Sequence, residues 1–105
     1  MGNEGYPAYA TAKSAITGLT RSLARELGPF NIRVNAIMPG WVLTKRQMDL
    51  WATEEDLSKH LDRQCLKEHL SGFDIVGGTL FLASGTSKMM TSQALVIDGG
   101  VVVTG

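Results

Sequence analysis

Cysteine is nearly absent from this sequence, since Cys65 is the only one among its 105 residues. A single thiol cannot form an internal disulfide, and no charged stretch followed by an apolar one predicts a secretory signal at the start. Both absences argue against an oxidising compartment. We therefore expect a cytoplasmic protein.

An excess of either charge is also lacking, because ten basic residues balance ten acidic ones. The two signs are interspersed, which excludes the basic patch that attracts nucleic acid or an anionic membrane. No apolar run approaches the roughly 20 residues that span a bilayer. His60 and His69 lie in a highly charged segment without metal-ligand spacing, so we expect both on the solvated surface and no metal site. Small molecules are the favoured partners.

The apolar content, at 44%, is sufficient for one small core, and we predict a single domain over residues 1–105. Apolar residues recur on one helical face from residue 9 to residue 27, where Gly28-Pro29 ends the pattern. Thr53 and Asp56 form a capping-box pattern that predicts a second helix of about four turns.

Residues 73–84 predict a third helix, with an acidic residue in its first turn and apolar residues on one side. Gly77 and Gly78 lie inside it, and each costs roughly 1 kcal/mol relative to alanine. Either the helix packs very closely against a neighbour there, or its centre is weak.

Two short apolar runs predict strands. Residues 32–37 run into Pro39-Gly40, and residues 94–97 are closed by Asp98-Gly99-Gly100. The long and mostly helical stretch between them implies a parallel pair with a right-handed crossover. The expected fold is therefore α/β, the C-terminal part of a Rossmann-like doubly wound parallel sheet with about two strands and three helices.

Four motifs resemble the second half of the short-chain dehydrogenase/reductase family. They are Tyr9-Ala10-Thr11-Ala12-Lys13, Asn35-Ala36-Ile37-Met38-Pro39-Gly40, Leu80-Phe81-Leu82-Ala83-Ser84 and Asp98-Gly99-Gly100. The resemblance covers nearly the whole chain. It implies an NAD(P)-dependent oxidoreductase that transfers hydride between the cofactor and a hydroxyl or carbonyl substrate.

The spacing of Tyr9 and Lys13 has a physical reason. Residues four apart lie on one helical face, so an ammonium can sit beside the phenol and lower the pKa of the phenol from its usual value near 10. The resemblance implies that both residues are catalytic and bind cofactor. Tyr9 would accept the proton of the substrate hydroxyl, and Lys13 would also hold the ribose hydroxyls.

The loop after the first predicted strand is the second candidate site, because ligands bind beyond the carboxyl ends of strands in open α/β sheets. The resemblance implies that Pro39 and Gly40 belong to the cofactor-binding loop. It also implies that the backbone of Val42 and the hydroxyl of Thr44 approach the nicotinamide amide. The alternative is a plain turn.

The segment that follows looks like that of the family's sugar 1-dehydrogenases, which oxidise an aldose to its lactone. A flat aromatic ring and polar groups suit a sugar, so Trp41 and Gln47 are candidate substrate residues. The substrate would be a small alcohol or sugar. The upstream residues that would distinguish NAD from NADP in this family are not in the sequence.

The glycine-rich turn that binds the pyrophosphate in this family is also lacking, and so is the serine that polarises the substrate oxygen. We therefore expect a partial domain without the N-terminal nucleotide-binding half, inactive on its own. A second hypothesis is a non-catalytic fragment or assembly module. An unpaired edge on the first strand and the family's subunit contacts would make it a homo-oligomer, either a dimer or a tetramer.

Overall fold

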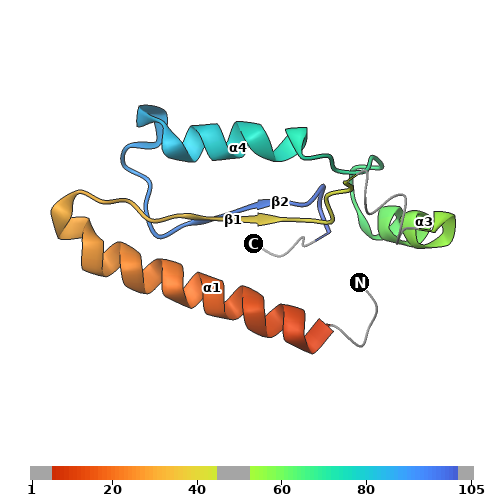
Figure 1. Ribbon diagram of the computed structural model, residues 1–105, viewed down its shortest axis with the longest axis horizontal. Coiled ribbons are helices and arrows are strands. Elements are labelled where there is room, and N and C mark those ends of the chain that lie inside the picture. Colours follow the sequence, from red (N-terminus) through yellow and green to blue (C-terminus); the bar gives the residue numbers. More distant parts are fainter. Residues whose placement is uncertain (1–5, 45–52, 102–105) are drawn as a thin grey trace.

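The computed structural model describes residues 6–44 and 53–101 (Figure 1). Within these ranges the main elements follow the expected order of helix, strand, helix, helix, strand. They are α1 (Tyr6–Leu27), the short 3-10 helix η2 (Gly28–Phe30), β1 (Ala36–Pro39), α3 (Glu54–Arg63), α4 (Phe73–Ala83), the short 3-10 helix η3 (Gly85–Ser87) and β2 (Ala94–Ile97).

The two strands form a parallel sheet, in which Ala36 lies opposite Ala94 and Pro39 opposite Ile97. Figure 1 shows α1 on one face of this sheet and α4 on the other. This three-layer arrangement with a helical crossover is the predicted doubly wound α/β fold, which the structure confirms.

The first strand begins later than predicted. The structure places β1 at Ala36–Pro39 instead of residues 32–37. The ladder runs from the Ala36 N–H, 2.9 Å from the Gln93 oxygen, to the Gly40 N–H, 2.8 Å from the Ile97 oxygen. Since alternate residues donate to β2, the nitrogen of Pro39 points away from that strand, so a proline fits there.

The helix α1 includes the predicted residues 9–27 and begins three residues earlier, with Pro7 in its first turn, where the missing N–H is tolerated. Its C-terminal half packs on the sheet, and Thr20 and Ala24 are buried. Ile16 and Leu19 belong to the predicted apolar face, yet they are 51% and 58% exposed. The described residues therefore cover only part of that face.

The helix α3 begins as its capping pattern predicts, because the Thr53 hydroxyl accepts a hydrogen bond from the Asp56 N–H at 3.1 Å. It is shorter than expected and ends at Arg63. The ammonium of Lys67 folds back onto its last carbonyls and donates to the oxygens of Leu61 and Gln64, at 2.7 Å and 2.5 Å. This satisfies acceptors that the helix end would leave unpaired.

The glycines of α4 resolve the question that the sequence left open. A Cβ on Gly78 would lie 2.7 Å from Cδ1 of Ile97 and 3.2 Å from Cδ2 of Leu95, whereas a Cβ on Gly77 would meet nothing within 4 Å. The helix therefore packs very closely on β2 at Gly78. No helix in the described part of the chain is long and apolar enough to cross a membrane.

Candidate functional site

The loop at the carboxyl end of β1 is held tightly at its start. A Cβ on Gly40 would lie 2.8 Å from Cα and Cβ of Asp98 and 3.0 Å from Cδ1 of Leu70. Only glycine allows this approach without a shift of the backbone. The loop is therefore fixed between the end of β2 and the segment that precedes α4.

A single parallel bridge joins Val42 to Leu70, and the Leu43 N–H donates to the Leu70 oxygen at 2.9 Å. Successive N–H groups of an extended chain point to opposite sides. The N–H of Val42 accordingly points away from Leu70, and it has no hydrogen-bond partner among the described residues. This N–H can donate a hydrogen bond to a carbonyl oxygen of a ligand.

Trp41 of the same loop contacts α3. Its ring and that of His60 are edge to face, with centroids 5.2 Å apart and an interplanar angle of 87°. His60 is only 7% exposed, so the expectation of a solvated histidine was wrong. His69 is half-buried and also departs from the expected solvated position. The many charged residues of α3 gave no indication in the sequence that one face of this helix packs on the loop.

Burial lowers the pKa of His60 because it disfavours the imidazolium. The positive charges of Arg63 and His69 lower this pKa further, while the side chain of Gln64 acts in the opposite direction. The imidazole is thus kept neutral near pH 7.

The turn after β2 lies next to the loop that follows β1. Gly99 and Gly100 have φ angles of 68° and 88°, a conformation that favours glycine. Their carbonyls accept hydrogen bonds from the Leu66 and Cys65 N–H groups, at 2.8 Å and 3.2 Å. The Asp98-Gly99-Gly100 motif is therefore a docking turn for the segment after α3, consistent with the structural role that its pattern suggests.

Lys13 lies in α1, half-buried, and its ammonium forms no ion pair within the described residues. Tyr9 lies one turn earlier in the same helix, and the structure describes its position in the helix but not its side chain. Figure 1 places this end of α1 at the same end of the molecule as the carboxyl ends of the strands. The two predicted parts of the site are therefore on the same side.

The remaining predicted residues belong to the end of β1 and the loop after it. Pro39 and Thr44 are exposed, and Trp41 is half-buried. Gln47 falls outside the described residues.

Sequence reasoning missed Gln64, which is 2% exposed and donates through Nε2 to the oxygens of Leu66 and Glu68, at 2.6 Å and 2.7 Å. A lone glutamine after a helix carries no pattern that could have indicated this.

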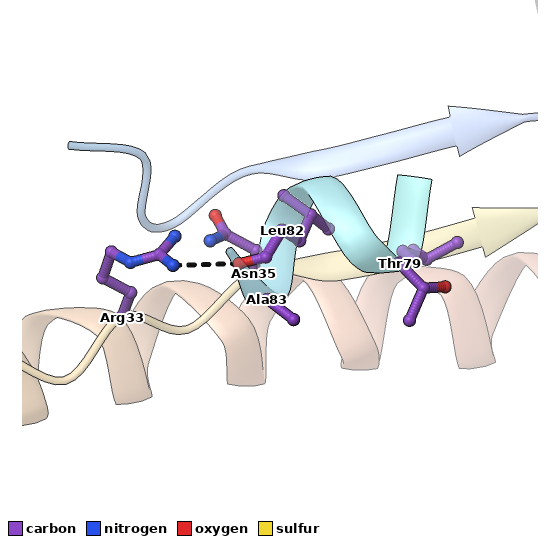
Figure 2. A pocket seen from close by; sticks show the side chains of 6 residues that line it. Arg33, Asn35, Thr79, Leu82 and Ala83 are labelled. Atoms are coloured by element: carbon purple, nitrogen blue, oxygen red, sulfur yellow. Dashed lines mark hydrogen bonds between the residues drawn. The ribbon is translucent and has the colours of Figure 1, made fainter. Parts of the chain in front are cut away.

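A pocket also lies between α4 and the chain around the start of β1, at some distance along the sheet from the loop after β1 (Figure 2). It is lined by Arg33 and Asn35 of the chain before β1, by Ile37 of β1, and by Thr79, Leu82 and Ala83 of α4. None of these was predicted as a site residue. The guanidinium of Arg33 is engaged by backbone oxygens, including that of Leu82 at 2.9 Å, so its role is structural.

The sequence model of a family described as enoyl-(acyl carrier protein) reductase matches residues 1–102. The chain belongs to the short-chain dehydrogenase/reductase family. One similar relative in this family is a "Probable galactose dehydrogenase" of Rhizobium meliloti (strain 1021), 60% identical over 95 residues, which are 90% of this chain and 37% of the relative. A D-xylose 1-dehydrogenase of Caulobacter vibrioides is 43% identical over 100 residues, 95% of this chain and 40% of the relative.

Solved structures of the short-chain dehydrogenase/reductase fold agree with the architecture. A 4-hydroxyisoleucine dehydrogenase in complex with NADH superposes with a TM-score of 0.84 at 33% identity, over 94% of this chain and 41% of that protein. A short-chain dehydrogenase from Leptospira borgpetersenii with bound NAD+ superposes with a TM-score of 0.79 at 34% identity, over 89% of this chain and 34% of that protein. The chain therefore spans about two fifths of the length of the curated relatives it matches.

Proposed function

We propose that this chain supplies the proton-transfer end of an NAD(P)-dependent dehydrogenase that acts on a hydroxyl group of a sugar. One observation carries the proposal: the end of α1 with Tyr9 and Lys13 lies at the same end of the molecule as the loop whose Val42 N–H has no partner among the described residues. Ligands of open α/β sheets bind at that end.

The donors present suit the nicotinamide half of a dinucleotide. The Lys13 ammonium has no carboxylate partner in the described ranges, so it is available to ribose hydroxyls and to the Tyr9 phenol. The Val42 N–H can donate to the amide oxygen of the nicotinamide ring. The bound cofactor would supply the hydride acceptor.

In the proposed oxidation, Tyr9 would take the proton of the substrate hydroxyl, and the hydrogen on the same carbon would be the hydride that the bound cofactor accepts. For an aldose in its ring form this carbon is the anomeric one, and the product is a lactone, a reduced cofactor and one proton. Lys13 stabilises the phenolate through its charge. The reverse direction returns the proton from Tyr9.

A sugar is the proposed substrate class because two similar relatives are named as galactose and D-xylose dehydrogenases. The ring of Trp41, which belongs to the loop after β1, offers the flat apolar surface that a pyranose or furanose ring needs. Gln47 is the proposed polar contact. NAD and NADP both remain candidates for the cofactor.

The 105 residues should show no useful turnover alone, because the sequence has neither a glycine-rich pyrophosphate turn nor the expected serine. The test is a fluorescence titration of the chain with NADH and NADPH, together with an assay for reduced cofactor on galactose and xylose. We expect weak binding and no production. Turnover that Tyr9→Phe abolishes would contradict the predicted inactivity of the chain alone. Cofactor binding that is undetectable, or that is as strong in Lys13→Ala as in the parent chain, would count against the site itself.

A second candidate function is assembly without catalysis, and exposed apolar side chains favour it. Leu19 of α1 is 58% exposed, and Phe73 and Leu80 of α4 are 84% and 63% exposed. Apolar groups of this size on two helices indicate surfaces that pair with protein. A second copy of the chain or a complementary part of such a dehydrogenase would cover them.

A further inference from the structure

The contact between Trp41 and His60 joins the loop after β1 to α3. Trp41 follows β1 in the loop proposed to bind the nicotinamide, and His60 lies in the last turn of α3. Their edge-to-face geometry is the one that aromatic pairs prefer. A change in either ring is therefore transmitted to the other segment.

One ring nitrogen of His60 is buried without a partner in the part of the chain that the structure describes. Its Nε2 is buried and has no hydrogen-bond partner among the described residues, and the same holds for Oε1 of Gln64 and Nδ1 of His69. Buried imidazoles normally find partners, and an unpaired one is costly. The Gln64 side chain is the polar group beside His60 that raises its pKa, and the contact that the ring itself makes is the edge-to-face one with Trp41.

We propose that His60 is a positioning residue for Trp41, whose neutral imidazole holds the indole in one orientation and whose protonation releases it. The importance of that orientation for a sugar ring rests on the proposed function, whereas the contact itself does not.

Protonation acts against the contact for reasons that the neighbours of His60 supply. Arg63 on the same helix and His69 on the following segment place positive charge beside the ring, and Gln64 contributes no charge. An imidazolium is attracted by an indole face, but its burial and these two like charges oppose it. The lowered pKa of His60 agrees with this balance.

The test uses the full 105-residue chain with Trp51→Phe, which leaves Trp41 as the single tryptophan. Its emission and its quenching by acrylamide are followed from neutral to acidic pH. We expect Trp41 to be shielded at neutral pH and to become accessible in a transition below the ordinary histidine value of about 6.5. Far-ultraviolet circular dichroism is recorded at each pH.

Three further substitutions in the Trp51→Phe background separate the explanations. His60→Phe keeps an aromatic ring and should retain the shielding without the transition. His60→Gln should lose both, while His69→Gln should retain both.

The proposal is overturned if the transition persists in His60→Phe, if His60→Gln behaves like its parent, or if helix content falls with the same midpoint. No cofactor or substrate is present in this experiment. Its outcome is therefore independent of whether the chain takes part in dehydrogenation.

Discussion

Arg33 closes the connection between α4 and β2 with one side chain. Its Nη1 donates to the oxygens of Ser87 and Met90, at 2.8 Å and 3.2 Å. Its Nη2 donates to those of Leu82 and Ser84, at 2.9 Å and 3.2 Å. A planar guanidinium can satisfy acceptors on several sides at once, which an ammonium cannot.

We predict that Arg33→Lys lowers the free energy of unfolding by about 1–3 kcal/mol, since it leaves partly buried carbonyls without donors. Urea unfolding followed by circular dichroism measures this. The control is Arg25→Lys on the exposed side of α1, where we expect little change. Equal effects at both positions would mean that the charge of Arg33, rather than its geometry, is what matters.

His60 predicts a dependence of stability on pH. Its folded pKa lies below the value of about 6.5 expected in the unfolded chain. The unfolded state therefore binds more protons in the interval between the two values, and stability falls as the pH drops through that interval. Above it the contribution is constant.

His60→Phe should remove this part of the pH dependence. The measurement is the free energy of unfolding by urea at about pH 7.5 and about pH 5.5, on either side of the unfolded value. The parent chain should lose more stability between the two conditions than the variant does. An identical loss in both would assign the pH dependence to other groups.

At the scale of the residue, the sequence indicates candidates that belong to a recurring pattern. It does not indicate polar residues that become buried when one helix packs on another segment. Tyr9 and Lys13 stay predicted site residues, indicated by their spacing on one helical face and by the family resemblance. His60 and Gln64 look like solvated residues of a charged segment, since polarity alone does not tell which face of a helix docks. Only the packing of α3 on the loop reveals them.

The packing of α4 on β2 leads to a prediction at the scale of the element. Gly77→Ala should raise the free energy of unfolding by up to about 1 kcal/mol, because alanine favours helix and its Cβ meets nothing. Gly78→Ala should lower it by about 1–3 kcal/mol, because its Cβ would collide with the side chain of Ile97.

These two adjacent positions form a matched pair, compared by thermal and urea unfolding. If both variants were stabilised, the contact between α4 and β2 would be looser than the structure has it.

The elements were predictable where local chemistry decides them. The cap at Thr53 and the end of α1 before Pro29 follow from side chains within the same turn. The start of β1 was not. Residues 32–35 have the composition of a strand, yet a backbone bond from the Ser92 N–H to the Val34 oxygen and side-chain bonds of Arg33 and Asn35 join them to the segment after α4 without a regular ladder. Such long-range partners leave no trace in a local pattern.

At the scale of the molecule, the described residues bury few large apolar side chains. The buried apolar residues among those described are Ala24, Ala36 and Leu70. Within the described ranges β1 pairs with β2 alone, so its other edge has no partner there. Exposed apolar faces together with such an edge favour association.

We predict that the chain associates with itself at micromolar concentration, as light scattering would show. Leu19→Lys on α1 and Leu80→Lys on α4 should weaken this association by placing charge on the exposed apolar faces. Ser58→Lys, on an exposed polar position of α3, is the matched control. A monodisperse monomer in the parent chain would contradict the prediction.

Asn35 behaves like an additional peptide group between the two segments that become the sheet. Its Nδ2 donates to the Met90 oxygen at 2.9 Å, and its Oδ1 accepts from the Gln93 N–H at 3.1 Å. Deamidation would replace that donor with a carboxylate oxygen facing a carbonyl, and two acceptors repel. The chemical ageing of this one amide would therefore loosen the sheet at the end opposite the proposed site.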